Sequence, residues 1–327
     1  MKKKVLVTMT FTPDFITGFD SCVEILESNG FEVIVDERAK SLSKEELISS
    51  LKGVYAHVAS AETYSEDLLN ELDGSLKIIS RMGVGYDHID VDAISKRGIA
   101  LTITPGANAE AVAEHTMALM MALTRKLKEI DAEIRQGIWK SYFGVTMYRK
   151  TLGIIGTGNI GKQLAKNVSG FDMRVLAYDL YPNEAFAKEN NVTYCSMETL
   201  LRESDFISVH IPYNPGDAPT IGEKEFAMMK PTAQFFNCAR GELVDEKALY
   251  KALVEKKIAG AGLDVFEQEP TPSDNPLFTL DNVLMTPHTS GMTFEGRKKV
   301  IDMAFQNIVD ISEGKKPIGL VNPQIYK

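Results

Sequence analysis

Three glycines with the spacing Gly-x-Gly-x-x-Gly lie where an apolar run gives way to a helical pattern: Gly156, Gly158 and Gly161. The apolar run, residues 151–155, is typical of a short buried strand, and residues 162–168 have helical periodicity. At a strand-to-helix turn the first glycine permits a tight turn, the second lets the backbone approach a pyrophosphate, and the third lets the helix pack on the strand. The N–H groups at the helix start favour a bound phosphate. This segment therefore predicts a dinucleotide-binding domain.

An acidic residue follows the next β-rich run. That run covers residues 173–178, and Asp179 stands directly after it. A carboxylate about twenty residues beyond the glycines accepts hydrogen bonds from both ribose hydroxyls of NAD and repels the 2′-phosphate of NADP. The residues that follow, Leu180, Tyr181 and Pro182, include no arginine. The sequence therefore favours NAD over NADP.

Composition limits the class of protein. With 327 residues the chain fits two domains better than one core. The net charge of -9 argues against a nucleic-acid surface and an anionic membrane surface, and no apolar stretch is long enough to span a bilayer. The three cysteines, Cys22, Cys195 and Cys238, form no Cys-x-x-Cys pair. This usage predicts a reduced, cytoplasmic protein without a structural metal.

Short β-rich runs alternate with helical patterns along the chain. Before the glycines, we predict strands at residues 5–8, 32–35, 55–58, 77–80 and 100–102, and helices at 20–29, 44–51, 65–71 and 91–96. After them, we predict strands at 206–209, 234–238, 261–265 and 283–285, and a last helix at 294–312. This alternation is typical of parallel sheets flanked by helices.

Two chain crossings divide this pattern into domains. Residues 1–103 and 290–327 are predicted to form one discontinuous, flavodoxin-like substrate domain around an inserted Rossmann NAD-binding domain, residues 104–289. The predicted fold class is thus α/β, with two doubly wound parallel-sheet domains. Residues 108–136 are predicted as one long helix that is apolar on several faces. We expect this helix to be buried, to bridge the domains and to continue into a subunit interface.

Three loops after predicted strands each carry one side chain with useful chemistry: Arg240, Glu269 and His288. Ligands collect at the carboxyl ends of strands in open α/β sheets, so we expect the three to converge. A guanidinium suits a carboxylate or carbonyl oxygen, and an imidazole exchanges protons near neutral pH. A carboxylate beside the imidazole fixes its tautomer and favours its protonated form. The alternatives for these residues are a surface Arg-Gly turn, a Glu-Pro loop and a structural histidine.

The chain resembles the D-isomer-specific 2-hydroxyacid dehydrogenases, a family that includes D-lactate, hydroxypyruvate/glyoxylate and D-3-phosphoglycerate dehydrogenases. The matching segments cover nearly the whole chain: residues 76–90, 113–114, 153–161, 237–242, 262–270 and 286–291. The resemblance implies the discontinuous domain arrangement and a homodimer built on the NAD domain and the long helix. It also places Arg240, Glu269 and His288 on the family's catalytic arginine, glutamate and histidine.

The same resemblance implies binding residues. Backbone N–H groups of the loop 82–85 would bind the substrate carboxylate, as an anion nest does. The predicted substrate residues are Val84, Gly85, Arg240 and His288. Asp264 would meet the nicotinamide carboxamide, and Cys238 and Ala239 would line its ribose. The predicted cofactor-binding residues are Gly156, Gly158, Asn159, Ile160, Gly161, Asp179, Pro212, Cys238, Ala239, Arg240 and Asp264.

Some positions depart from the family's pattern. Met147-Tyr148 stands where many members have Glu-Leu, and Asp217 stands where threonine is common. Ala59 lies near a position where phosphoglycerate-using members often carry arginine. No replacement cation is evident there, which counts against a phosphorylated substrate. The other histidines have no metal-ligand spacing and are interpreted as structural or surface residues: His57, His88, His115 and His210.

The resulting hypothesis is an NAD-dependent oxidoreductase that interconverts a small D-2-hydroxy acid and a 2-keto acid. His288 would act as general acid and base, Arg240 and the loop 82–85 would orient the substrate, and domain closure would exclude water. Two alternatives stay open, namely a phosphoglycerate dehydrogenase proper and a non-catalytic NAD-sensing interaction protein on the same fold.

Overall fold

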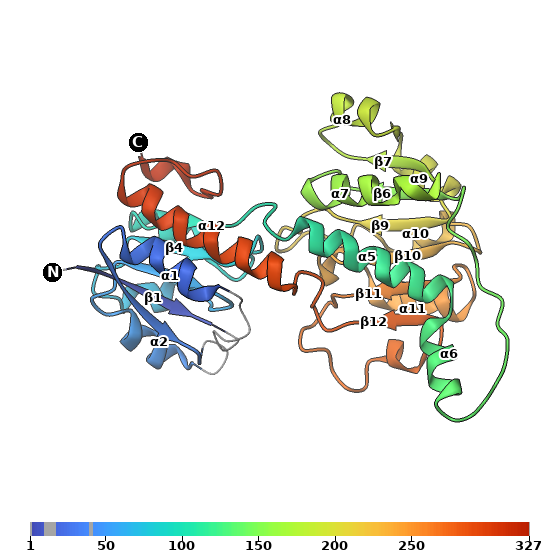
Figure 1. Cartoon of the computed structure of the whole chain (residues 1–327), viewed down its shortest axis with the longest axis horizontal. Coiled ribbons are helices and arrows are strands. Elements are labelled where there is room, and N and C mark those ends of the chain that lie inside the picture. The colour runs from blue at the N-terminus through green and yellow to red at the C-terminus, as the bar shows by residue number, and fades with distance from the viewer. Residues whose placement is uncertain (1, 10–17, 39–41, 327) are drawn as a thin grey trace. The chain divides into compact units, whose positions relative to one another are not determined.

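The computed structural model describes residues 2–9, 18–38 and 42–326. The chain divides into two compact units, one formed by residues 1–108 and 292–327 and the other by residues 109–291. The elements of both units are labelled in Figure 1. The predicted boundaries, after residues 103 and 289, differ from this division by a few residues.

The first unit contains a sheet of five parallel strands in the order β2-β1-β3-β4-β5. Its strands are β1 (Lys3–Thr8), β2 (Phe31–Asp36), β3 (Ala56–Ala59), β4 (Ile78–Arg81) and β5 (Ala100–Thr102). Val5 pairs with Val33 on one side and with Ala56 on the other. This order is the flavodoxin-like one, and its switch point lies between β1 and β3.

The helices of this unit, apart from the short last one, bury apolar side chains in its core. They are α1 (Phe19–Glu27), α2 (Lys44–Leu51), α3 (Glu66–Asn70), α4 (Val91–Lys96), α12 (Phe294–Ser312) and the short η5 (Pro323–Tyr326). Helix α12 packs against α1 and β4, burying Ile301, Phe305 and Ile308. The Ser80 hydroxyl donates to the Ala304 carbonyl at 2.7 Å. Residues 294–312 form one helix, as predicted.

The second unit contains seven parallel strands in the order β12-β11-β10-β9-β6-β7-β8. They are β6 (Thr151–Ile155), β7 (Arg174–Tyr178), β8 (Val192–Tyr194), β9 (Phe206–Val209), β10 (Gln234–Asn237), β11 (Gly260–Leu263) and β12 (Val283–Met285). This is the Rossmann order with an added strand, and its switch point lies between β6 and β9. The two parallel sheets confirm the predicted fold class.

Strand ends differ from the sequence-based expectation by at most two residues, except that β8 was not predicted. This strand has three residues at the sheet edge, and only its first, Val192, is buried. A strand that short shows no clear alternation of apolar and polar residues.

The predicted long helix is wrong, because the chain forms two helices there, α5 (Ala109–Thr124) and α6 (Leu127–Ile134). Between them Lys126 adopts a left-handed conformation with φ of 54°. The Thr124 carbonyl accepts the Val145 N–H at 3.0 Å, so it is engaged outside the helix. Helix α5 is buried against α7 and β10–β12, whereas α6 buries none of its residues.

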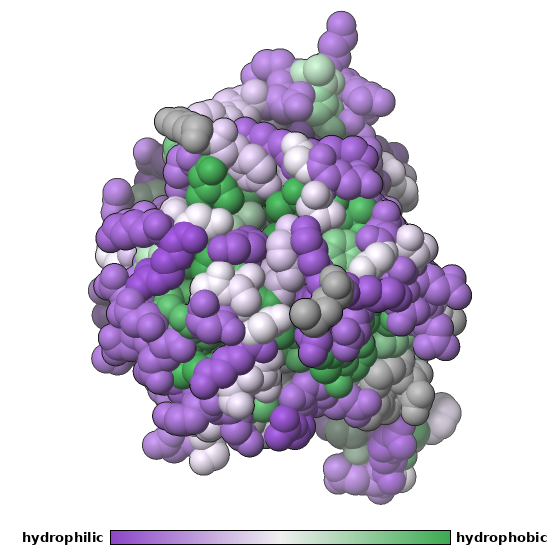
Figure 2. Space-filling model, turned by 90° about the vertical axis from the view of Figure 1, so that its left-hand side faces the viewer, coloured by the Kyte–Doolittle hydropathy of each residue, from purple (hydrophilic) through white to green (hydrophobic). Residues whose placement is uncertain are grey.

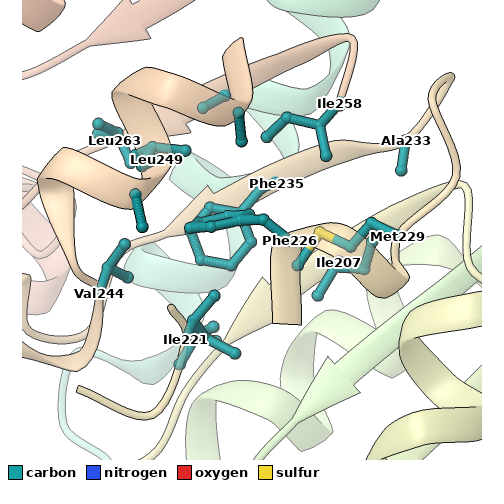
Figure 3. Close-up of a cluster of buried hydrophobic side chains, with 14 of the residues drawn as sticks. Ile207, Ile221, Phe226, Met229, Ala233, Phe235, Val244, Leu249, Ile258 and Leu263 are labelled. Atoms are coloured by element: carbon teal, nitrogen blue, oxygen red, sulfur yellow. The ribbon is translucent and has the colours of Figure 1, made fainter. Parts of the chain in front are cut away.

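The remaining helices of the second unit connect its strands. They are α7 (Asn159–Asn167), η2 (Val168–Phe171), α8 (Glu184–Glu189), α9 (Met197–Glu203), α10 (Glu223–Met228), η3 (Gly241–Leu243), α11 (Glu246–Val254) and η4 (Pro276–Thr279). Figure 3 shows the core where α10 meets the sheet, with Ile207 and Met229 close to Phe226 and Phe235. The two phenyl rings meet edge to face, 5.5 Å apart between centroids, an arrangement that aromatic pairs favour. This core supports the strands whose ends carry the site.

The surface differs from these cores. Hydrophilic side chains cover most of the face shown in Figure 2, with apolar ones between them. Such a mixture is usual on a solvated surface.

Candidate functional site

The glycine-rich turn follows β6 and contains glycines of two kinds. A Cβ on Gly156, whose φ is 93°, would lie 2.6 Å from the His210 carbonyl oxygen, and one on Gly161 would lie 2.1 Å from the Gly156 oxygen. A Cβ on Gly158 would meet nothing within 4 Å among the described residues. The fold itself therefore requires two of the glycines, while Gly158 leaves open space where a phosphate can approach the backbone.

Helix α7 begins at this open space. Its N-cap is Gly158, and no side chain from the described ranges caps the helix there. The first N–H groups of a helix lack partners within the helix, and the helix dipole adds positive potential at this end. Asn159 and Ile160 lie in this first turn. The turn can thus bind an anionic phosphate through backbone N–H groups.

Asp179 lies at the end of β7, beside the glycine-rich turn. Its carboxylate accepts hydrogen bonds from the Thr157 N–H at 2.6 Å, the Thr157 hydroxyl at 2.8 Å and the Tyr181 N–H at 2.8 Å. Partial burial alone would raise the pKa of Asp179, but these hydrogen bonds outweigh burial and lower it. The Tyr194 hydroxyl lies 2.8 Å from that of Thr157, so the neglected strand β8 also supports this carboxylate.

Arg240 follows β10 in a turn held by a buried amide. The Asn237 side chain accepts the Ala239 N–H at 3.0 Å and donates to the Arg240 carbonyl at 2.7 Å. The guanidinium donates to the Ala239 carbonyl at 2.7 Å. A Cβ on Gly241 would lie 1.9 Å from the carbonyl carbon of Phe266, so this turn packs directly on the loop that carries the glutamate.

Glu269 and His288 are brought together from two loops. Glu269 Oε2 lies 2.6 Å from His288 Nδ1, and Glu269 Oε1 accepts the Phe266 N–H at 3.1 Å. Partial burial would raise the pKa of Glu269, but the bond from His288, the nearby charges of His288 and Arg240, and the Phe266 bond lower it. Glu269 is thus a carboxylate at neutral pH, and it orients the imidazole through Nδ1.

Asp264 follows β11 and is fully buried. Its carboxylate accepts the Thr286 hydroxyl at 2.6 Å and the N–H groups of Thr289 and Ser290, each at 2.8 Å. Its carbonyl accepts the His288 N–H at 2.7 Å. Its assignment to the cofactor stays a prediction, and in the structure its carboxylate organises the loop that carries His288.

Two other predicted cofactor residues lie at the same edge of the sheet. Cys238 is buried after β10, and burial raises the pKa of its thiol to about 12, so it remains a neutral thiol. Pro212 follows His210, whose Nε2 lies 2.8 Å from the Ser208 hydroxyl. Burial lowers the pKa of His210 to about 4, which supports its interpretation as a neutral structural residue.

Asn237 and the pair His115–Thr286 are the site residues that sequence reasoning missed. Asn237 ends a buried strand and stands three residues before a loop arginine, a position suited to a local side-chain bond. His115 Nε2 lies 3.0 Å from Thr286 Oγ1, although the two residues are far apart in the chain. The sequence contained a signal for Asn237 but none for His115.

The loop 82–85 of the first unit follows β4. The Met82 N–H donates to Ala59 and the Gly83 N–H to Arg81, at 2.8 and 2.9 Å. Among the described residues, no protein acceptor takes the N–H of Val84 or Gly85. These two partly exposed groups are thus the ones that can bind an anion.

A cation does lie near Ala59, contrary to the sequence-based expectation. Arg81 pairs with Ala59 in the register of β3 and β4, and its Nη1 donates to the Met82 carbonyl at 2.8 Å. The Glu62 carboxyl, whose pKa is raised chiefly by burial, is near enough for the Arg81 charge to act on it. The argument against a phosphorylated substrate is weakened, because Arg81 on β4 lies beside Ala59 on β3.

The described residues include no group of three or more His, Cys, Asp or Glu that could hold a metal ion. His57 lies between Thr8 and Tyr64 in the core, and burial lowers its pKa to about 3. In the described ranges, no helix is long and apolar enough to cross a membrane.

Known proteins resemble this chain over most of its length. Residues 117–290 match the model of the D-isomer specific 2-hydroxyacid dehydrogenase family, NAD binding domain. A glyoxylate reductase of Korarchaeum cryptofilum is 40% identical over 92% of this chain and 95% of that protein. A D-3-phosphoglycerate dehydrogenase of Methanocaldococcus jannaschii is 40% identical over 98% of this chain but 59% of that protein. The NAD-complexed structure of a D-isomer specific 2-hydroxyacid dehydrogenase from Lactobacillus delbrueckii ssp. bulgaricus has a TM-score of 0.80 at 28% identity, covering 98% of this chain and 100% of that one.

Proposed function

The chain belongs to the D-isomer-specific 2-hydroxyacid dehydrogenase family, NAD-dependent oxidoreductases of 2-hydroxy and 2-keto acids, and we propose that it reduces a small 2-keto acid with His288 as its general acid. In the reverse direction His288 is the general base. The observation that carries this proposal is the 2.6 Å contact between Glu269 Oε2 and His288 Nδ1. Because Nδ1 is engaged, Nε2 is the ring nitrogen that exchanges a proton with the substrate oxygen.

Arg240 and Glu269 support this proton transfer in different ways. The Glu269 carboxylate holds the imidazole through Nδ1, so that Nε2 can donate to the developing alkoxide during reduction. Arg240 offers a planar guanidinium to the substrate carboxylate and carbonyl oxygen. In the first unit, we assign the N–H groups of Val84 and Gly85 to the substrate carboxylate.

We propose the following cofactor-binding residues in the second unit. When bound, NAD accepts or supplies the hydride. We assign the pyrophosphate to the turn Gly156–Gly161 with Asn159 and Ile160, and the adenosine ribose to Asp179. Asp179 is held as a carboxylate by its hydrogen bonds, which favours NAD over NADP. The remaining cofactor assignments are Pro212, Cys238, Ala239, Arg240 and Asp264.

A phosphorylated substrate is the second candidate, favoured by one observation. Arg81 stands beside Ala59 at the end of β4 and could meet a phosphate. The nearby Glu62 carboxyl opposes this, because it already interacts with the Arg81 charge that a phosphate would need. We therefore propose an unphosphorylated acid such as glyoxylate or hydroxypyruvate, and expect 3-phosphohydroxypyruvate to be a poorer substrate.

The test is NADH oxidation, followed by absorbance, with glyoxylate, hydroxypyruvate, pyruvate, 2-ketoisocaproate and 3-phosphohydroxypyruvate, and with NADPH as a cofactor control. We expect turnover with NADH and an unphosphorylated acid. His288→Asn should lower kcat by about a hundredfold to ten-thousandfold while NADH binding, followed by fluorescence, is unchanged. Full turnover by the variant would remove His288 from this role, and no turnover by the unmodified enzyme with any acid would reject the enzymatic proposal.

We also propose that the protein is a homodimer whose interface includes α6 and the segment after it. Helix α6 buries none of its residues, and Trp139 and Phe143 are 92% and 96% exposed. Large apolar side chains so exposed on neighbouring segments commonly mark an interface. Sedimentation of Trp139→Ser with Phe143→Ser should show a shift toward monomer. Ile318→Ser, at a residue 97% exposed in the other unit, is the matched control and should leave the dimer intact.

We propose a cytoplasmic location. Cys22, Cys195 and Cys238 are all free thiols, as is usual in a reducing compartment. Cell fractionation with an antibody to this chain tests the location, and recovery from a secreted or membrane fraction would contradict it.

A further inference from the structure

His115, on the buried helix α5, lies next to the end of β12. Its Nε2 is 3.0 Å from Thr286 Oγ1, and Thr286 Oγ1 is 2.6 Å from Asp264 Oδ1. Three side chains from α5, from the end of β12 and from the end of β11 thus form a continuous row. Neither the proton transfer nor the cofactor assignments above use His115 or Thr286.

The direction of the hydrogen bonds in this row follows from chemistry. The hydroxyl of Thr286 has one hydrogen, and it donates that hydrogen to the Asp264 carboxylate. The Thr286 oxygen can then only accept from His115, so His115 must carry a hydrogen on Nε2. Both the imidazolium and one neutral tautomer meet this requirement.

Asp264 depends on this row because it is fully buried. A buried carboxylate is costly unless hydrogen bonds and a partner charge compensate it. Among the described residues, three donors reach its oxygens, and Thr286 is the only one of them that belongs to a side chain. His115 Nε2 lies 3.7 Å from Oδ1, and this contact is an ion pair only when the imidazole carries a charge.

The backbone that Asp264 holds is strained at His288, the proposed general acid and base. His288 has a φ of 50°, in the left-handed region that a residue with a side chain rarely adopts. Such a conformation persists only where its surroundings fix it. Here the N–H groups of three successive residues, His288, Thr289 and Ser290, all point to Asp264.

We propose that His115, acting through Thr286, is a positioning residue that fixes Asp264 and thereby holds the loop 286–290 with the His288 imidazole toward Glu269. His115 touches neither reacting atoms nor His288 in this assignment. The inference rests on the proposed role of His288 as general acid and base. It adds a residue of helix α5, His115, to the groups that hold His288 in place.

Four variants separate the hydrogen-bonded row from simple packing. Thr286→Val removes the hydroxyl at nearly constant shape, and Thr286→Ser keeps the hydroxyl. His115→Leu removes the donor, and His115→Gln keeps an N–H donor near the position of Nε2. The conservative variants are the matched controls, since each changes the side chain but retains the hydrogen bond.

We expect Thr286→Val and His115→Leu each to lower kcat about tenfold, with little change in the KM for NADH, because each breaks the hydrogen-bonded row between His115 and Asp264. Thr286→Ser and His115→Gln should stay within about twofold of the unmodified enzyme. The double variant Thr286→Val with His115→Leu should lose about tenfold and not a hundredfold, since residues of one row are not additive. Losses that multiply, or controls that fail like the deletions, would overturn the proposal.

A second measurement does not depend on turnover. Hydrogen exchange by mass spectrometry should show faster exchange of the amides 288–290 in Thr286→Val and His115→Leu than in their controls. Equal protection in all four would overturn the proposal even if the acid panel fails. His288→Asn distinguishes the two ideas, because it tests the role of the imidazole and should leave the protection of 289–290 unchanged.

Discussion

The two halves of the seven-stranded sheet build their sites in different ways. After β6 the proposed phosphate site is formed mainly by backbone atoms, because the turn depends on glycines, which have no side chain. Beyond β10, β11 and β12 the loops are fixed by buried polar side chains, above all Asn237 and Asp264. One half leaves space and donors for a ligand, and the other holds reactive side chains in place.

This difference has a physical cause. A pyrophosphate needs close approach to several N–H groups, and any Cβ in the way prevents that approach. Proton transfer instead needs an imidazole at a defined place, and that requires partners for its backbone and its ring. Activity should therefore be sensitive to the loss of a single polar group in the loops after β10, β11 and β12. In the glycine-rich turn after β6, the addition of a single carbon should disturb the fold or cofactor binding.

Among the variants that test this difference, Asp264→Asn is expected to have the largest effect, on kcat/KM. The amide would place an N–H₂ group against a backbone N–H that now donates to the carboxylate. Two or three charge-assisted bonds would be lost or weakened, so kcat/KM should fall roughly a thousandfold, about 4 kcal/mol. Steady-state kinetics with the best acid of the panel measure it.

Asp205→Asn is the matched control for that change. Asp205 accepts the Thr151 N–H at 2.9 Å and pairs with Lys230, but it stands at the start of β9 and away from the loops. Its loss should lower stability and leave kcat/KM within about threefold. If both variants lost activity equally, the special role of the catalytic half would be disproved.

The next effect compares two glycines of the same turn. Gly161→Ala should destabilise the second unit by about 3 kcal/mol, because the new carbon would lie 2.1 Å from the Gly156 oxygen. Gly158→Ala has room, so it should cost less than about 1 kcal/mol in stability but raise the KM for NADH about tenfold. Urea unfolding and NADH titration measure the two quantities. Unchanged NADH binding by Gly158→Ala would place the pyrophosphate elsewhere.

A smaller effect is expected from Asp179→Asn, which removes the charge and keeps one acceptor oxygen, enough for Thr157 or for Tyr181 but not for both. The preference for NADH over NADPH should fall about tenfold, about 1.4 kcal/mol, because the 2′-phosphate is no longer repelled. The ratio of kcat/KM for the two cofactors measures it. An unchanged ratio would mean that another residue sets the preference.

The smallest effect concerns the pH dependence of stability. The pKa of Glu269 is lowered in the folded protein, so its contribution is present above the unfolded value near 4.5 and is lost as pH falls through the folded pKa. Glu269→Gln removes that dependence, so the stability difference between the two proteins should shrink below pH 4.5. Because the pair is partly exposed, we expect less than about 1 kcal/mol. Urea unfolding at several pH values checks the sign, and a difference that grows toward low pH would contradict it.

Much of the fold could be read from local patterns. The strands and the helix at residues 294–312 lie where periodicity and turn residues place them, because burial on a parallel sheet imposes that pattern. There were two exceptions. The predicted helix from residue 108 breaks after Thr124, where Lys126 is left-handed and the Val145 N–H bonds to the Thr124 carbonyl, and β8 is too short to show a period.

The sequence by itself located the glycine-rich turn and the acidic residue after β7, because backbone sterics and side-chain chemistry are local properties. It also supplied Arg240, Glu269 and His288 as candidates, whose proposed catalytic roles come from the family resemblance. Only the tertiary structure decided what holds them. The bonds of Asp264 to the loop 286–290 and of His115 to Thr286 join segments distant in the chain. Arg81 likewise reached Ala59 from the neighbouring strand. Spacing along one segment carries no information about such partners, since folding alone brings them within hydrogen-bond distance.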